Sequence, residues 1–111
     1  MKINGHELEF RLSNAAMAER YEQALAEMRQ GCQTPASGSL AQVIRAQTAL
    51  VRAFVDRLFG QGTYQALGLD PDELEENLAA MRQIVEESGR QAQAVKTQAG
   101  RYSPDKVRRG K

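Results

Sequence analysis

The residues with the greatest chemical potential are carboxylates crowded into seven positions: Asp70, Asp72, Glu73, Glu75 and Glu76. Such a cluster suggests a site for a hard cation, because Ca²⁺ and Mg²⁺ take oxygen ligands. The spacing differs from that of an EF-hand loop, which needs alternating oxygen ligands around a central glycine. Carboxylates are also favoured in the first turn of a helix, where the macrodipole is positive. We therefore interpret the cluster as a helix start with a solvated face and predict no metal site.

The other residues suited to catalysis or cofactor binding have no partner nearby in the sequence. His6 is the only histidine, and a general base or metal site would need a second group. Cys32 is the only cysteine and lies in a polar stretch without a histidine motif, so we expect no nucleophilic role. Gly60-Gln61-Gly62 lacks the Lys-Ser/Thr pair of a phosphate loop and follows a predicted helix, so it is interpreted as a helix break. We therefore predict that the protein has no catalytic residue, binds no cofactor and is not an enzyme.

Length and composition indicate one small domain with a modest core. The chain has 111 residues, of which 41% are hydrophobic and only 5% aromatic. A small domain with so few aromatic side chains has little stability to spare, so we expect burial against a partner or a second copy. The single cysteine fits a reducing cytoplasm, and no stretch resembles a signal peptide or a transmembrane span. We predict a cytoplasmic protein with no membrane association.

The charge of the chain is balanced overall but uneven along its length. The net charge is +1, which argues against a general nucleic-acid or membrane-surface binder. Residues 101–111 nevertheless carry five basic side chains against Asp105, a net charge of +4, which leaves −3 for residues 1–100. The alternative hypothesis is therefore a small nucleic-acid-binding regulatory protein that uses this tail. Only Tyr102 is there to stack on bases, and we consider nucleic acid the weaker hypothesis.

The first elements predicted along the chain are a hairpin and a helix. Asn4-Gly5 suits a type I′ turn between residues 1–3 and 6–12, and alternation runs through Leu8, Phe10 and Leu12. Ser13 or Asn14 is expected to cap a helix that runs to about Gln30, with Gly31 as its stop. Residues 31–39 form a polar linker that we expect either to let this helix move against the rest of the fold or to be partly disordered.

Two further amphipathic helices follow. The second is predicted over residues 40–59, capped by Ser39, with Leu50, Val51, Phe54 and Leu58 among the most buried positions. The third is predicted to start with Asp70 as N-cap, Pro71 at N1 and Glu73 completing a capping box. Its apolar stripe is Leu74, Leu78, Met81, Ile84 and Val85. The fold class is therefore mainly α (α+β), with an N-terminal β-hairpin packed on three amphipathic helices. Residues 1–99 are predicted to form the single domain, and residues 100–111 a disordered basic tail.

Three stretches of the chain, taken in order, carry a resemblance to known proteins. They are Lys2-Ile3-Asn4-Gly5-His6-Glu7-Leu8-Glu9-Phe10, then Ala18-Glu19-Arg20-Tyr21-Glu22-Gln23-Ala24-Leu25, then residues 44–62 with Phe54-Val55-Asp56-Arg57-Leu58-Phe59-Gly60 near their end. Together they resemble small uncharacterised proteins of phages and prophages of Gram-positive bacteria, which are similar to the tail assembly chaperones of long-tailed phages. The similarity covers residues 1–88, and the helix that ends in Phe-x-x-x-Leu-Phe-Gly is its most specific part.

The resemblance implies a chaperone that is absent from the finished virion. It would bind the long, helical tape measure protein and help tail tube protein subunits to polymerise around it. A chaperone of this kind needs apolar surface that is exposed or can become so, and methionines supply adaptable surface. The alternative, that the methionines simply fill the core, stays open. We expect self-association through helical faces, and the predicted partner-binding residues are Met17, Tyr21, Met28, Phe54, Leu58, Phe59 and Met81.

The C-terminus gives a first testable prediction. The resemblance implies two products, because ribosomes slip near the end of such genes, and Gly110-Lys111 is a dipeptide that a slippery run would encode. We predict that deleting residues 101–111 leaves the fold intact, because the segment is polar and highly charged. We also expect the native gene to yield a minor, longer product. Circular dichroism of the truncated chain and immunoblotting of the native gene's products test both points, and a single product without slippery codons would contradict the second.

Overall fold

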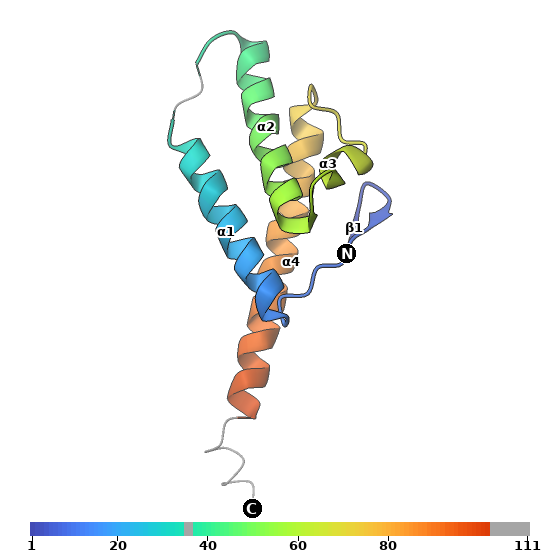
Figure 1. Ribbon diagram of the computed structural model, residues 1–111, viewed down its shortest axis with the longest axis vertical. Helices are drawn as coiled ribbons and strands as arrows, with labels where there is room; N and C mark the ends of the chain where they lie inside the picture. Colours follow the sequence, from blue (N-terminus) through green and yellow to red (C-terminus); the bar gives the residue numbers. More distant parts are fainter. Residues whose placement is uncertain (35–36, 103–111) are drawn as a thin grey trace, which may run out of the picture.

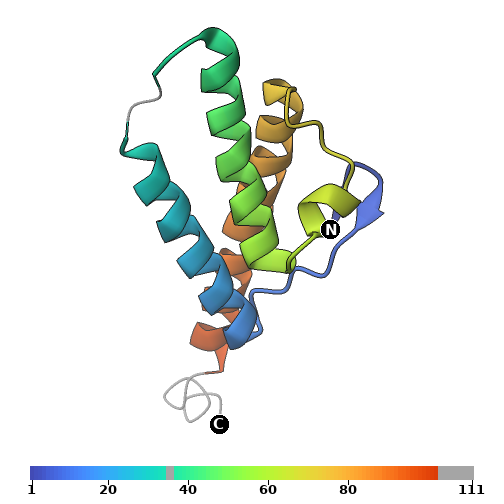
Figure 2. The ribbon, with the colours of Figure 1, turned by 45° about the horizontal axis from the view of Figure 1, so that its top comes forward.

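Three long helices form the frame of the molecule, with a hairpin at one side (Figure 1). The computed structural model describes residues 1–34 and 37–102. α1 (Ala15–Cys32) and α2 (Leu40–Phe59) are antiparallel, the short α3 (Thr63–Ala66) follows, and α4 (Leu74–Arg101) runs in the same direction as α2 (Figures 1 and 2). The strands β1 (Lys2–Ile3) and β2 (His6–Glu7) pair antiparallel. The predicted fold class, mainly helical with an N-terminal hairpin, is confirmed.

The first two helices begin where the sequence predicts. The Asn14 side chain accepts a hydrogen bond from the Met17 amide at 3.0 Å and caps α1. Ser39 and Gln42 form a reciprocal capping box at α2, with distances of 3.2 and 2.8 Å. A capping box satisfies amides that the first helical turn leaves without partners, which explains why α2 matches the predicted residues 40–59.

The predicted stop of α1 at Gly31 is wrong, because the helix continues to Cys32. Gly31 lies against α2 instead: a Cβ atom added there would lie 2.5 Å from Cδ2 of Leu50. This glycine therefore allows two helices to approach closely instead of ending one of them.

The predicted cap of the third helix is also wrong. α4 begins at Leu74, with Glu73 at the N-cap and no side-chain cap hydrogen bond. The Asp70 carboxylate instead accepts from the Asp72 amide at 2.9 Å, which holds residues 70–73 in a turn. The Thr48 hydroxyl of α2 donates to the Pro71 carbonyl at 2.6 Å. The contact with Thr48 thus holds residues 70–73 in a turn that precedes α4.

The hairpin is short and is anchored by Ile3, which is fully buried. Asn4 and Gly5 have φ angles of 50° and 81°, as a type I′ turn requires. The alternating residues after Glu7 do not continue as a strand. The side-chain amide of Gln91 holds them instead, because it donates to the Phe10 carbonyl and accepts from the Leu12 amide, both at 2.7 Å.

The core lies between α2, α4 and the N-terminal hairpin. Val51, Phe54 and Leu58 are buried as predicted, whereas Leu50 is only half-buried because it lies at the edge that faces α1. Leu78 and Val85 of the predicted stripe are 41% and 45% exposed. The buried face of α4 is formed by Asn77, Ala80, Met81, Ile84 and Ser88. Leu78 and Val85 therefore fall on the flank of this face.

Asn77 is the fully buried polar side chain at the start of α4. Its Nδ2 donates to the carbonyls of Asp70 and Glu73 at 2.8 and 2.7 Å, and its Oδ1 accepts from the Tyr64 hydroxyl at 2.6 Å. Within the described residues, every buried side-chain nitrogen or oxygen has a hydrogen-bond partner. Asn77 thus joins α3, the 70–73 turn and α4 in one satisfied network.

The second half of α4 projects beyond the start of α1 (Figure 1). Gly100 and Arg101, predicted to open the disordered tail, are helical instead. The Gln- and Ala-rich stretch before them contains good helix formers, so a helix anchored in the core can propagate through it. The rest of the predicted tail, residues 103–111, lies outside the described residues.

We predict that Asn77→Ala lowers the free energy of unfolding by about 2–3 kcal/mol, because it leaves buried polar groups without partners. Tyr64→Phe removes one hydrogen bond of the same network and should cost about 1 kcal/mol. Urea denaturation followed by circular dichroism measures both. Gln98→Ala, at an exposed position of the same helix, is the control. An Asn77→Ala variant as stable as this control would contradict the role of the network.

Candidate binding groove between α1 and α2

The seven predicted partner-binding residues divide between core and half-buried positions. Phe54, Leu58 and Met81 are buried. The half-buried positions, which pack against the core, are Met17, Tyr21, Met28 and Phe59. The structure brings only part of this set to one surface, because Met28 and Phe54 line a common groove.

All three aromatic residues of the predicted partner-binding set belong to an internal cluster. Tyr21 packs edge-on against Phe10 and Phe54, with ring centroids 5.7 and 6.0 Å apart, and Phe10 packs against Phe59 at 5.9 Å. These contacts join the N-terminal segment, α1 and α2. Edge-to-face pairs of this kind stabilise a core beyond simple area burial. In this conformation the aromatic residues therefore act in packing.

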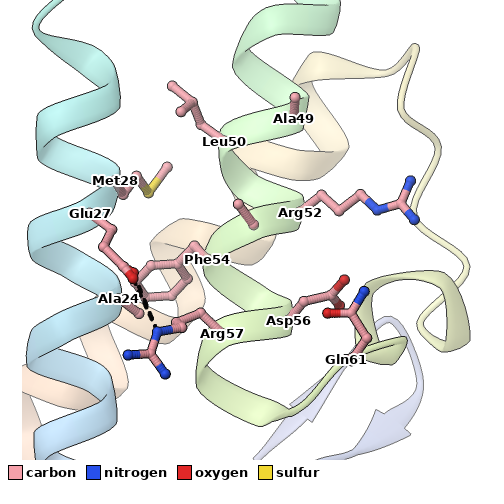
Figure 3. A pocket seen from close by; sticks show the side chains of 11 residues that line it. Ala24, Glu27, Met28, Ala49, Leu50, Arg52, Phe54, Asp56, Arg57 and Gln61 are labelled. Carbon is pink, nitrogen blue, oxygen red and sulfur yellow. Dashed lines mark hydrogen bonds and ion pairs between the residues drawn. The ribbon is translucent and has the colours of Figure 1, made fainter.

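The groove lies between α1 and α2 and has a volume of about 550 Å³ (Figure 3). Met28 extends from α1 toward Leu50 of α2, and the Phe54 ring lies below them (Figure 3). The remaining apolar lining consists of the alanines Ala24, Ala49 and Ala53. Because alanine ends at Cβ, these positions leave the space that a larger side chain would fill.

The rim of the groove is polar and carries both charges. On one side the Arg57 Nε atom lies 3.0 Å from Oε1 of Glu27 (Figure 3), and Arg57 Nη2 donates to Gln23 at 2.7 Å. On the other side stand Arg52 and Asp56. The Asp56 carboxylate already accepts from the Tyr64 amide at 2.9 Å, so it also serves to fix α3.

Part of this site was missed by reasoning from sequence. Leu50 was expected in the core, and Ala49, Ala53 and Arg57 were not among the predicted binding residues. A signal was present in the two alanines, which lie four residues apart and therefore share one flank of α2. Nothing in the sequence showed that this flank borders a groove shared with α1.

The shifted pKa values belong to residues outside the groove. Burial raises the pKa of the Tyr64 phenol, and the hydrogen bond with Asn77 and the nearby Arg52 guanidinium oppose this shift without cancelling it. A hydrogen bond from the N-terminal ammonium group lowers the pKa of Glu7. Across residues 1–34 and 37–102, no group of three His, Cys, Asp or Glu side chains is placed to hold a metal ion. The chemistry that the groove itself offers is apolar contact with a charged rim.

Comparison with known proteins gives one family. A family of unknown function, DUF6673, matches residues 4–111. The chain belongs to this family. The match to DUF6673 includes the Gln- and Ala-rich end of α4 and the basic tail, beyond the residues 1–88 that carry the resemblance to phage proteins. No curated protein and no solved structure matches the chain. In the part of the chain that the structure describes, no helix has the length and apolarity needed to cross a membrane.

We predict that the ion pair between Glu27 and Arg57 couples α1 to α2 only weakly. Both side chains are about half exposed, and exposed pairs contribute about 0.2–1 kcal/mol. A double-mutant cycle with Glu27→Ala and Arg57→Ala should therefore give a coupling energy below about 1 kcal/mol that falls as salt is added. Coupling of several kcal/mol that salt does not change would show a rigid rim instead.

Proposed function

We propose that this DUF6673 protein is a non-enzymatic tail assembly chaperone of a long-tailed phage. It binds the tape measure protein in the host cytoplasm and assists assembly of the tail tube around it. The observation that carries the proposal is the groove between α1 and α2, which has an apolar floor and a rim of mixed charge. The resemblance of residues 1–88 supplies the identity of the partner.

An amphipathic helix suits this groove. Proteins that bind helices commonly receive an apolar stripe in a groove and leave the polar flanks at its edges. Here Met28 and Leu50 form apolar walls, and the Met28 thioether adapts to different side chains. Glu27, Arg57 and Arg52 on the rim offer partners for polar flanks of either charge. A helical tape measure segment presents these features repeatedly along its length.

The groove is suited to moderate, reversible binding. Its volume of about 550 Å³ lies in the range of pockets that bury a few large groups, so it takes several side chains of a helix at a time. A contact of this size leaves little surplus after the cost of association. Such binding protects an apolar segment and still releases it when tail tube subunits compete for the same surface.

Movement of α1 would enlarge the groove. α1 ends at Cys32 and α2 begins at Leu40, and the linker that was expected to let α1 move includes residues 35–36, which lie outside the described residues. The side-chain contacts that join α2 to α1 at the rim of the groove are the exposed interactions of Arg57 with Glu27 and Gln23. Separation of α1 from α2 would also expose Tyr21 and Phe54, which now pack against each other.

Co-expression with overlapping fragments of the tape measure protein from the same phage tests the proposal. At least one helical fragment should co-purify with the chain. Met28→Gln should weaken its binding roughly tenfold, because the apolar contact of one large side chain is lost. Glu22→Gln places the same side chain on an exposed part of α1 away from the groove and should leave binding unchanged.

Two outcomes would contradict the proposal. In the first, no fragment binds to a correctly folded chain. In the second, the chain instead retards DNA in a manner that salt abolishes, which would favour the nucleic-acid-binding alternative. The position of the gene next to one for a very long coiled-coil protein would support the chaperone.

A further inference from the structure

We propose that one side of α4 is the interface of a homodimer in which the two α4 helices pair antiparallel. This side, called the open side here, is defined by Glu75, Leu78, Arg82, Val85, Glu86, Gly89, Gln93 and Lys96. All eight residues are exposed. The inference does not depend on the proposed function, because the groove lies on α1 and α2.

The open side is the part of α4 that the rest of the fold leaves free. One side of the helix packs in the core through Met81 and Ile84. A second side receives the N-terminal segment, since Gln83 donates to the Lys2 carbonyl and Gln91 donates to the Phe10 carbonyl. The open side faces away from both, over the whole length of the helix.

The centre of the open side is apolar. Leu78 and Val85 lie seven residues apart, which places them on one line along the helix, and they are 41% and 45% exposed. Ala92, which is half-buried, continues this line into the projecting half, and the exposed Gly89 lies beside it. If two copies meet antiparallel about Val85, the large Leu78 side chain of each lies opposite the partner's Ala92. Large and small residues then interdigitate along the interface.

The charges of α4 select the antiparallel arrangement. Its first half, residues 74–87, carries four acidic side chains and one basic one, a net charge of −3. Its second half, residues 88–101, carries three basic side chains and no acidic one, a net charge of +3. Antiparallel pairing lays each acidic half against a basic half, whereas parallel pairing lays like charges together. On the open side, Glu75 would lie near the partner's Lys96, and Arg82 near the partner's Glu86.

The projecting half of α4 gives an independent reason for a second copy. Isolated helical segments of this length are marginal in water, because they gain little from propensity alone. In the described residues after Gln91, only Ala92, Val95 and Gly100 are even half-buried. A 28-residue helix is about 42 Å long, so in the register centred on Val85 the partner helix covers α4 from Leu74 to Lys96.

The association of the full-length chain tests the interface. Sedimentation velocity over a concentration series should show a dimer, and Val85→Glu should shift it to the mass of one chain. Ala94→Glu adds the same charge at an exposed position on the far side of α4 and should leave the dimer intact. A wild-type chain that stays monomeric at the highest concentration would overturn the proposal, as would a dimer that Val85→Glu leaves unchanged.

Charge reversal tests the orientation. Lys96→Glu should raise the dimer dissociation constant roughly fivefold, since the symmetric interface contains each pair twice. The further change Glu75→Lys should restore dimerisation, because it recreates the pair with reversed signs. Failure of the second change to restore it would exclude the antiparallel register.

The two proposals fail separately. Val85→Glu should still bind a tape measure fragment through the groove, and Met28→Gln should still dimerise. Loss of both properties in either variant, with the fold retained, would overturn the assignment of two distinct surfaces.

Discussion

The structure depends on side-chain amides of α4 that hydrogen-bond to the backbone of distant segments. Asn77 holds the 70–73 turn, and Gln91 holds the segment around Phe10 and Leu12. Ile84, fully buried, lies midway between them on the same side of the helix. Irregular backbone must find hydrogen-bond partners when it packs on a core, and these amides supply them. α4 is therefore the element on which the N-terminal segment and the α3 region are assembled.

This arrangement decides which surfaces remain free. One side of α4 and the inner sides of α1 and α2 are buried in the core, and the N-terminal segment covers another side of α4. The close approach of Gly31 to Leu50 keeps α1 beside α2. The alanines at positions 24, 49 and 53 leave the groove below that contact. The groove and the open side of α4 thus result from the same packing, although they lie on different elements.

The energetic character of the fold suits a protein that works by contact. Its three phenylalanines and Tyr21 join the N-terminal segment to α1 and α2, and the rest of the core is aliphatic apart from Tyr64 and Met81. Such a small core supplies limited stability, so surfaces that a partner covers contribute materially to the folded state. The interactions of Arg57 at the groove rim are weak because they are exposed, so that water and salt screen them.

Local chemistry in the sequence determined the elements and several of their ends. The Asn4-Gly5 turn, the Asn14 cap and the Ser39 capping box each involve neighbouring residues, so their patterns suffice. The periodicity of residues 40–59 likewise predicted which side of α2 is buried. Prediction failed where contacts between distant segments compete with local preference. Asp70 and Pro71 form a turn bound to Thr48 instead of a helix cap.

Only the tertiary structure decided which faces of the helices are buried and which stay exposed. Where an apolar stripe is wider than the neighbouring helices can cover, the sequence does not reveal which of its residues stay exposed. Leu50, Leu78 and Val85 were therefore all expected to lie on buried faces. Their burial depends on where α1 and α2 lie around them, and that arrangement depends on contacts such as Gly31 with Leu50 and Gln91 with Phe10. The sequence therefore determined a hairpin and three amphipathic helices. The packing of these elements alone made a groove from alanines and left one side of α4 open.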